Sequence, residues 1–534
     1  MEHFFSLLGS LISTSLISLR WNELCFVLLL SFFSLGCYSI FKKQKIQVFI
    51  RWPIVDVLPS LLQNVHRVHD WSAELSAVVG GTIVGRGPIF GSLEVLFTCD
   101  PKNVEHMVKT KFNNYQKGPE FLETFSLIGK GIFNVGFDEW LAQRKMAHPK
   151  FTSNTFRNTV ASVSHAIVQD ALLPLLSHIA KHEWVVDLED VFLRYTYDST
   201  FRVIFGGNSS NLSLEFPENE LGKAIDDGTE AMFFRNVTPS QWWKLLRWLK
   251  LGKEKKLYEA AKIVDKHLYQ IISSKRNELS KGVEANDLLA AYMTSNKNPI
   301  TSKSLSLTFD DKFLRDTALT FLFAGRDSTG TALTWFFWSI SKSPHVEEKI
   351  LQELKEVLTS KHTNGDTEDQ KSSLKDFKSE ELKDLVYLHA ALCEALRLYP
   401  PLPMNQRIAV NDDVLPNGTV VKQGTKILIS YYAMARMEWV WGEDCHEFKP
   451  ERWIDENGKL SPEPLTKLFT FNAGIRNCIG KEMAFTQMKA VVASMMFNFK
   501  VELVEGQVMK SKPSLVLHTK NGMKVRIKKR ASLL

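Results

Sequence analysis

The sequence predicts a mainly α-helical protein that also contains small β-sheets. Apolar residues recur with helical periodicity from residue 103 to about residue 350 and again over residues 381–398. Strand-like alternation is confined to short segments near residues 81–97, near residues 420–430 and at the carboxyl-terminal end. No internal repeat and no linker rich in Gly, Ser or Pro divides these segments, so we expect one large unit.

The composition is that of an ordinary globular protein. Hydrophobic residues make up 44% and charged residues 23% of the 534 residues, which excludes collagen-like, coiled-coil and wholly disordered chains. The mean hydropathy of −0.12 argues against a protein with many membrane spans. The net charge of +7 is small for this length, suits a surface that meets anionic membranes or an acidic partner, and does not require nucleic acid.

Residues 1–45 predict an amino-terminal membrane anchor. Residues 24–41 carry no charge, are about long enough to span a thin bilayer, and are followed at once by lysines. Because positive residues tend to stay in the cytosol, this single span would leave the rest of the chain, residues 46–534, on the cytosolic side. A cleaved signal peptide is disfavoured by the lysines. The apolar run at residues 4–19 is either an interfacial helix or an extension of the targeting signal.

The elements of the body follow from local patterns. Residues 81–90 and 93–97, with a turn at Gly91, predict a first hairpin. The polar residues 360–380 lack periodicity and predict a surface loop before the helix at 381–398. Near the carboxyl terminus, the Asn521-Gly522 pair between alternating residues predicts a second hairpin.

One cysteine has a local sequence typical of a metal ligand. The six cysteines are scattered without CxxC spacing, so neither a disulfide framework nor a structural zinc site is expected. Cys478 lies between Gly474 and Gly480, which would let the backbone bend sharply beneath a bound metal. Phe471 can shield the sulfur. Arg476, two residues before the cysteine, can reach a carboxylate on the edge of a cofactor.

Residues 317–340 form a long apolar run whose only charges are Arg326 and Asp327. A second membrane span is disfavoured, because each charge at the centre of a span costs roughly 2.5–3.5 kcal/mol. A helix that is apolar on all sides is otherwise a core helix. Ala324-Gly325 would leave room for a ligand, and Asp327 and Ser328 place an acid beside a hydroxyl.

Two further pairs have helical spacing. Glu394 and Arg397, at i and i+3, share one helix face in an apolar run, and a buried pair needs further partners, such as Arg452. Trp140 and Arg144, at i and i+4, also share one face.

Residues 471–480 meet the pattern F-x-x-G-x-R-x-C-x-G at every fixed position, and on this motif the sequence resembles the cytochrome P450 family. The resemblance implies the P450 fold and a haem b cofactor whose iron is bound by the Cys478 thiolate. Phe471, Gly474, Arg476 and Gly480 would then form the loop around the cofactor.

The resemblance extends to the other motifs. In the family, a W-x-x-x-R helix such as Trp140–Arg144 holds a haem propionate. An E-x-x-R pair such as Glu394–Arg397, with a later arginine such as Arg452, locks the core behind the haem.

The family's oxygen-activating motif A-G-x-[DE]-T corresponds to AGRDST, residues 324–329. Ala324 and Gly325 would face the haem, and Asp327, Ser328 and Thr329 would carry the proton chemistry. Serine keeps the hydroxyl but lacks the β-methyl that fixes the threonine rotamer. We therefore expect activity to be retained with some uncoupling.

The resemblance implies a monooxygenase anchored in the endoplasmic reticulum membrane. The chain contains no flavin or nicotinamide domain, so electrons would come from NADPH through a separate NADPH–cytochrome P450 reductase. The stretch 241–257 adds membrane contact, since Trp242, Leu245, Leu246 and Leu249 fall on one helix face. A helix packed on the body is the alternative.

Several phrases of the sequence look most like the plant clan of fatty-acid ω-hydroxylases, and among them the midchain alkane hydroxylases. A lipophilic substrate with a long alkyl or acyl chain is therefore the leading expectation. Two alternatives remain open: a specialised-metabolism P450 that oxidises or couples an aromatic or terpenoid substrate, and a haem sensor or carrier without turnover. The acid and hydroxyl at Asp327 and Ser328 argue against the last.

Overall fold

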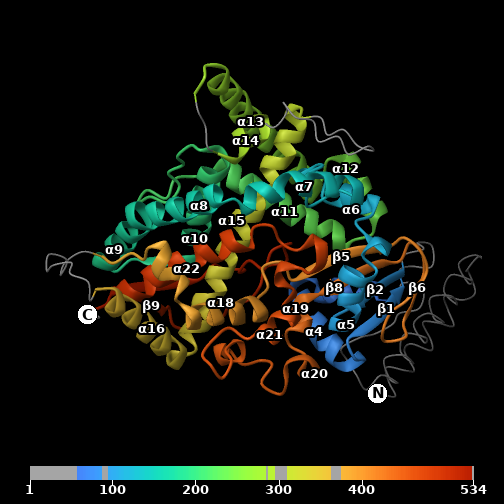
Figure 1. Ribbon diagram of the computed structural model, residues 1–534. Helices are drawn as coiled ribbons and strands as arrows, with labels where there is room; N and C mark the ends of the chain where they lie inside the picture. The colour runs from blue at the N-terminus through green and yellow to red at the C-terminus, as the bar shows by residue number, and fades with distance from the viewer. Residues whose placement is uncertain (1–56, 87–93, 284–286, 295–308, 363–373, 532–534) are drawn as a thin grey trace, which may run out of the picture. The chain divides into compact units, whose positions relative to one another are not determined.

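The computed structural model describes most of the chain (Figure 1), namely residues 57–86, 94–283, 287–294, 309–362 and 374–531. Two compact units are present. The larger unit comprises residues 64–84 and 95–534, and the smaller unit comprises residues 1–63 and 85–94. The predicted anchor within residues 1–45 lies outside the described residues.

Helices make up most of the described chain, which confirms the mainly α-helical prediction (Figure 1). The helices are α3 (Leu58–Asn64), α4 (Val68–Val79), α5 (Pro101–Glu105), α6 (Pro119–Thr124), α7 (Phe137–Thr152), α8 (Asn154–Ile167), α9 (Leu173–Lys181), α10 (Leu188–Phe205), α11 (Glu220–Val237), α12 (Ser240–Leu249), α13 (Gly252–Ser280), α14 (Leu288–Thr294), α15 (Asp311–Ser341), α16 (Pro344–His362), α17 (Ser379–Lys383), α18 (Val386–Leu398), α19 (Tyr431–Met434), α20 (Glu438–Trp441), α21 (Pro462–Lys467) and α22 (Lys481–Asn498).

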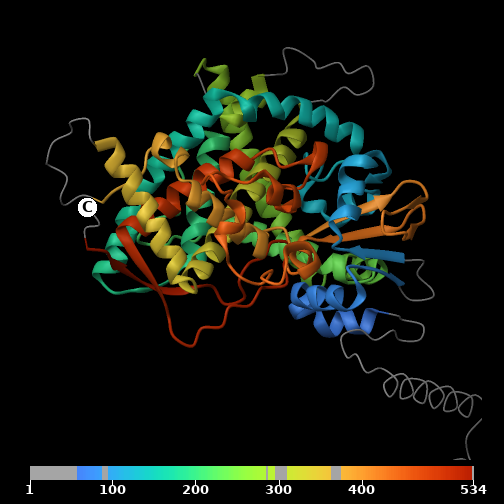
Figure 2. The same cartoon turned by 60° about the horizontal axis from the view of Figure 1, so that its bottom comes forward.

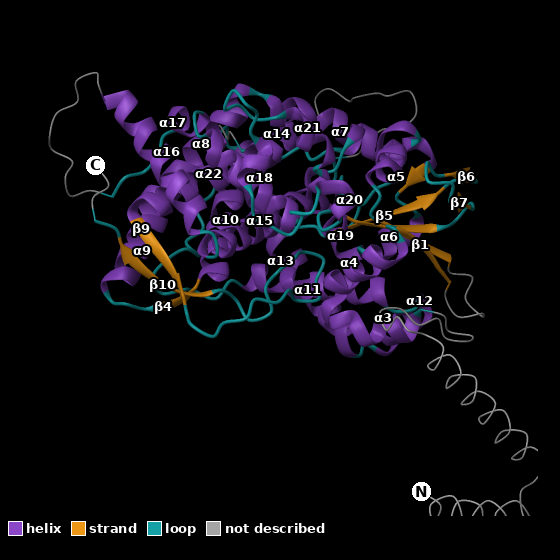
Figure 3. Cartoon of the chain, turned by 90° about the horizontal axis from the view of Figure 1, so that it is seen from below, coloured by secondary structure: helices purple, strands orange, loops and turns teal. Residues whose placement is uncertain are grey.

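Three small sheets accompany the helices. Their strands are β1 (Thr82–Arg86), β2 (Glu94–Thr98), β3 (Tyr115–Gln116), β4 (Val185–Asp187), β5 (Met404–Ala409), β6 (Asp413–Val414), β7 (Val420–Val421), β8 (Lys426–Ser430), β9 (Phe499–Leu503) and β10 (Lys524–Lys529). The strand orders are β1-β2-β8-β5-β3, β4-β10-β9 and β6-β7, with β2 and β8 parallel. Figure 3 shows β5, β6 and β7 on one side of the helical body and β4, β9 and β10 on the other. Figure 2 shows the same separation between the orange strands β5 and β8 and the red strands β9 and β10.

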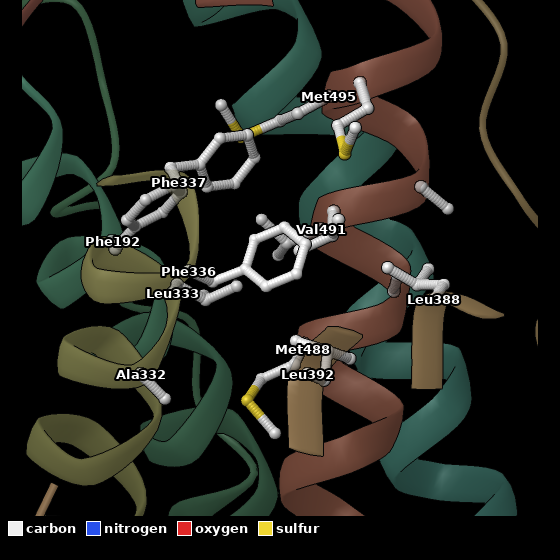
Figure 4. Packing of buried hydrophobic residues seen from close by; sticks show 14 of the residues in the cluster. Phe192, Ala332, Leu333, Phe336, Phe337, Leu388, Leu392, Met488, Val491 and Met495 are labelled. Carbon is white, nitrogen blue, oxygen red and sulfur yellow. The ribbon is translucent and has the colours of Figure 1, made fainter. Parts of the chain in front are cut away.

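Helix α15 is the central core element of the larger unit. Its first turn is capped by Asp310, whose Oδ1 accepts a hydrogen bond of 2.7 Å from the N–H of Phe313. Most of its side chains from there to Ile340 are buried. Figure 4 shows how Phe336 and Phe337 of α15 interdigitate with side chains of α10, α18 and α22. The long apolar run at residues 317–340 is therefore part of a core helix, as the sequence predicted.

Among the described residues, one helical stretch, Asn154–Lys181, is long and apolar enough to cross a membrane. Half of its most apolar window is buried within the protein. Val160, Leu172 and Leu176 of this stretch belong to the same buried cluster as α15. We therefore interpret it as a core helix of the body.

Two local predictions differ from the structure. The predicted hairpin at Asn521-Gly522 is wrong, because β10 pairs with β9 and β4 instead of with the residues just before the turn. A side chain at Gly522 would overlap the Asp187 carboxylate, so the glycine permits a close approach to that residue. The helix predicted over residues 381–398 is interrupted between α17 and α18, where Glu353 of α16 accepts two amide hydrogen bonds at the start of α18.

Glu394 of α18 is the centre of a buried polar network. Its Oε1 and Oε2 each accept a hydrogen bond of 2.8 Å from the Arg397 guanidinium, and neither residue is more than 2% exposed. The Nε of Arg452 lies 3.5 Å from Oε1, and the indole N–H of Trp453 donates to Oε2 at 2.9 Å. Arg397 also donates to the Ala435 carbonyl at 2.5 Å. The structure thus brings the predicted trio together and ties α18 to the segment that follows α19.

The Trp453→Phe variant tests the contribution of the indole donor. It removes one donor from a fully buried carboxylate, which should lower the free energy of unfolding by about 1–3 kcal/mol. Thermal unfolding monitored by circular dichroism measures the change. The control is Trp439→Phe, because that side chain is 52% exposed and should leave the midpoint unchanged. Equal midpoints for Trp453→Phe and the wild type would contradict the assignment.

Candidate active site

A large cavity lies between α15 and the loop that precedes α22. It contains about 1830 Å³ of space not filled by protein atoms, counting its open mouth. Its walls are mostly apolar, and α7, α10, β5, α22 and several other helices and loops also contribute to the lining.

Cys478 lines this cavity. A hydrogen bond between backbone groups of its own loop holds the loop in place. The N–H of Cys478 donates to the carbonyl of Phe471 at 2.8 Å. Gly474 has a φ of +66°, and a side chain there would overlap the carbonyl oxygen of Val108. Gly474 is therefore required by the fold of the loop. Gly480 has an ordinary φ of −93° and open space beside its Cα, so the bend predicted there is not strained and bare backbone faces the cavity.

The environment of the Cys478 sulfur has opposing effects on its charge. The side chain is exposed to the cavity although it lies deep among protein atoms. Burial raises the pKa of the thiol, while the N–H of Gly480 and the charges of Arg144 and Lys481 act in the opposite direction. A metal ion would supply the positive charge that a thiolate needs at this position.

The predicted Trp140 and Arg144 pair lies on the same cavity, one turn apart on α7. Arg144 donates to the carbonyl oxygen and to Oδ1 of Asn477 at 2.8 and 2.7 Å, next to Cys478. The guanidinium of Arg476 lies 4.7 Å above the centre of the Trp140 ring. The structure thus gathers four of the predicted cofactor residues at one wall.

Two cations on the cavity were missed by the sequence analysis, Lys117 and Arg407. Burial lowers the pKa of Lys117, and the charges of Arg407 and Arg476 lower it further. Burial likewise lowers the pKa of Arg407, and it lowers that of Arg476 to about 9. Their hydrogen bonds go to neutral oxygens: Lys117 and Arg407 donate to Oδ1 of Asn405 at 3.4 and 2.7 Å, and Arg476 donates to the Val135 carbonyl.

The cavity therefore fits an anionic ligand that also carries a metal. Among the described residues, no Asp or Glu lines it, so the four cations Lys117, Arg144, Arg407 and Arg476 have no carboxylate of the protein to pair with there. Buried charges without a partner are costly, and a ligand with two carboxylates would compensate them. Haem b has two propionates and an iron that needs an axial ligand. Cys478 would hold the iron. Arg144, as the sequence predicted, together with Lys117, Arg407 and Arg476, would hold the propionate edge.

Helix α15 forms the opposite wall through Ala324, Gly325, Ser328 and Thr329. A side chain at Gly325 would come within 2.7 Å of Thr200 on α10, so this glycine also permits close helix packing. The Ser328 hydroxyl donates to the carbonyl of Ala324 at 2.6 Å.

Asp327, predicted to act beside Ser328, does not line the cavity. Its side chain is fully buried, and its Oδ1 lies 2.7 Å from Nη1 of Arg326. Burial raises the pKa of the Asp327 carboxyl, although Arg326 opposes this effect. The predicted catalytic trio is thus divided, with two hydroxyls on the cavity and the acid behind them.

Comparison with known proteins agrees with this arrangement. The family model described as cytochrome P450 matches residues 87–526. Cytochrome P450 86B1 of Arabidopsis thaliana is 38% identical over 98% of this chain and 94% of its own length. Alkane hydroxylase MAH1 of Arabidopsis thaliana is 38% identical over 92% of this chain and 95% of its own length.

Noroxomaritidine synthase of Narcissus aff. pseudonarcissus MK-2014 is 39% identical over 90% of this chain and 91% of its own length. The matched family model covers most of the chain, and the relatives cover nearly all of it. The chain therefore belongs to the cytochrome P450 family of monooxygenases, which use haem b and receive electrons from NAD(P)H through a reductase.

Proposed function

We propose that this P450 hydroxylates an unactivated carbon of a long alkyl or fatty acyl chain. The observation that carries the proposal is the chemistry of the cavity, which combines extensive apolar walls with cations and, among its described lining residues, no carboxylate. With the cations facing the propionates, the apolar walls that remain favour a lipophilic chain, and no described lining residue offers a carboxylate to a basic amine. The similarity to a relative named as an alkane hydroxylase supports the same substrate class.

The apolar part of the cavity is suited to an alkyl chain. Phe133, Phe151, Phe156, Phe321 and Val516 contribute to its lining. Burying one CH₂ group against such side chains contributes about 0.8 kcal/mol, so a long chain gains affinity with every carbon. Orientation near the reacting centre then depends on shape more than on hydrogen bonds.

The proposed roles of the chain's own groups follow from their positions. Bound haem supplies the iron chemistry that activates dioxygen. Cys478 would bind the iron from one side, and α15 would face the opposite side with Ser328 and Thr329. Because Ser328 Oγ donates to Ala324, the hydroxyl must turn away from that carbonyl before it can donate a proton into the cavity. Asp327 would resupply protons from behind the helix.

A second candidate substrate class has its own support. A relative named noroxomaritidine synthase is as similar to this chain as the alkane hydroxylase is, so a specialised-metabolism substrate is a real alternative. The absence of any carboxylate among the cavity's described lining residues disfavours a substrate that carries a basic amine.

The proposal includes attachment to the endoplasmic reticulum membrane through a span at residues 24–41. Helix α12 supports a second membrane contact. Trp242, Leu245 and Trp248 are 54%, 45% and 78% exposed, while Trp243 points inward and is buried. The sequence analysis included Leu246 in this face, but its side chain is half-buried. Such exposed apolar side chains next to lysine and arginine suit the surface of an anionic bilayer.

The substrate class can be tested by turnover. The full-length protein with its reductase should convert a long-chain alkane or a long-chain fatty acid to a hydroxylated product in an NADPH-dependent reaction followed by mass spectrometry. A panel of phenols and one basic amine serves as the comparison. Turnover of the phenols or the amine, with none of the alkane or fatty acid, would contradict the proposal.

Membrane contact by α12 can be tested on the chain without residues 1–45. Replacing Trp242 and Trp248 by serine should weaken its binding to vesicles of phosphatidylcholine and phosphatidylserine. Each large apolar side chain contributes about 1.5–3 kcal/mol when buried, which corresponds to about tenfold or more per residue. Vesicle sedimentation measures the change. The control is Trp184→Ser, an exposed tryptophan outside α12. If the double variant binds as the parent does, α12 is not a membrane contact.

A further inference from the structure

A compact ionic cluster lies outside the cavity, where α10, α11 and α15 meet the segment before β10. Arg326 of α15 bridges two carboxylates: its Nη1 lies 2.5 Å from Oδ1 of Asp226 on α11 and 2.7 Å from Oδ1 of Asp327. His518 and Glu189 complete the cluster from the carboxyl-terminal segment and from α10. None of these five residues lines the cavity.

His518 is the residue that joins the two halves of this cluster. Its Nδ1 lies 3.1 Å from Oε1 of Glu189 and 3.3 Å from Oγ1 of Thr331. One ring nitrogen and one carboxylate oxygen each of Asp226 and Asp327 all lie within 4.8 Å of one another. The imidazole is therefore held by one carboxylate while it faces two others.

The partner of His518 is itself firmly positioned. Oε1 of Glu189 accepts a hydrogen bond of 3.0 Å from the N–H of Thr519, and the Thr519 hydroxyl donates to Oε2. These two hydrogen bonds fix the Glu189 carboxylate, which in turn holds the imidazole at Nδ1.

Two buried polar atoms of the cluster lack a hydrogen-bond partner, Oδ2 of Asp327 and Nε of Arg326. A buried oxygen without a donor is costly, and a proton or a bound water removes that cost. Oδ2 of Asp327 is therefore a place where an exchangeable proton can reside. The next two residues, Ser328 and Thr329, line the cavity.

The charges of the cluster leave room for one such proton. Three carboxylates face one guanidinium and one imidazole, so full ionisation with a protonated imidazole would leave a single negative charge. Burial raises the pKa of Asp327. Burial also disfavours ionisation of Asp226, but Arg326 outweighs it and holds the pKa of Asp226 below its usual value. The extra proton therefore belongs on Asp327.

The same carboxylates act on the imidazole. Burial opposes its charge, but the hydrogen bond to Glu189 and the charges of Asp327 and Asp226 outweigh burial and raise the pKa of His518. The other charged groups nearby are Arg326 and, on the histidine's own segment, Lys512, which lies close to Asp226. The Asp226 side chain is 40% exposed, which gives the cluster a solvent-facing end.

We propose that His518 is a positioning residue for the monooxygenase reaction. Its imidazolium returns a proton to Asp327 whenever that carboxyl releases one toward the cavity. The imidazolium becomes neutral imidazole in this step, and solvent at the Asp226 end restores its proton. Each turnover takes up two protons and two electrons. The electrons come from NADPH through the reductase, and none passes through the histidine.

The experiment uses the full-length enzyme with its reductase, and follows how electrons from NADPH divide between hydrogen peroxide and water without added substrate. His518→Gln keeps hydrogen-bonding capacity but cannot carry a proton in this way. It should raise the peroxide-to-water ratio about tenfold, less than the roughly 10²–10⁴-fold contribution of a directly acting general acid. Because no substrate is needed, this result is independent of the proposed substrate class.

The pH profile separates proton supply from a merely structural role. In the wild type, the peroxide-to-water ratio should stay low at pH values below the raised pKa of His518. This low ratio should be lost, and more peroxide should form, as the pH rises through that pKa. Glu189→Gln removes the charge that favours the imidazolium, so it should move this loss to lower pH. In His518→Gln this pH dependence should disappear. The matched control Thr331→Val removes the other neighbour of Nδ1 and should keep the wild-type profile.

A combined variant tests whether the histidine acts through Asp327. Adding His518→Gln to Asp327→Asn should change nothing further, because the proton acceptor is already absent. The proposal would be overturned if His518→Gln kept the wild-type pH profile. It would also be overturned if His518→Gln raised the peroxide-to-water ratio as much in the Asp327→Asn background as in the wild type. If His518→Gln fails to fold, the shift expected for Glu189→Gln decides the question.

Discussion

The site depends on one constraint: four positive charges line the cavity, and no carboxylate among its described lining residues pairs with them. Burial lowers the pKa of Lys117, Arg407 and Arg476. The charges of Arg407 and Arg476 lower the pKa of Lys117 further, and the charge of Arg407 lowers that of Arg476 further. The two propionates of haem b would compensate these charges. Cys478 lines the same cavity, so the cations and the sulfur proposed to bind the iron lie in one place.

The rest of the fold keeps the two sides of the cavity fixed. Helix α15 is buried along most of its length, and the Glu394 network ties α18 to the segments that follow β8. Because that network is fully hydrogen-bonded and almost completely buried, it resists rearrangement more than a surface ion pair would. The hydroxyls of Ser328 and Thr329 line the cavity, whereas Asp327 and the ionic cluster lie outside it.

The sequence was most informative where the chemistry needs a fixed local spacing. Each of three predicted motifs lies within one short segment: the loop at Cys478, the Trp140–Arg144 turn and the Glu394–Arg397 pair. In the structure, the residues within each motif lie as their spacing predicted. Lys117 and Arg407 could not be found in this way, because each is a single cation in an unremarkable segment and only tertiary packing brings it to the cavity. The five-residue cluster around His518 was hidden for the same reason.

The errors have the same physical origin. Asn521-Gly522 has the composition of a tight turn, but the strand after it finds better partners in β9 and β4. Gly480 was expected to relieve backbone strain, and instead it leaves open space beside the cavity. Asp327 follows the motif but faces Arg326, because a buried carboxylate is stabilised by the nearest cation.

The account is tested most directly by the absorption spectrum of the reduced carbon-monoxide complex of a Cys478→Ser variant. The wild-type protein should show the red-shifted Soret band that a thiolate ligand gives, and the variant should lose that band while circular dichroism shows an unchanged helical content. A variant that folds and retains the band would prove that another group binds the iron, and the assignment of Cys478 would then be wrong.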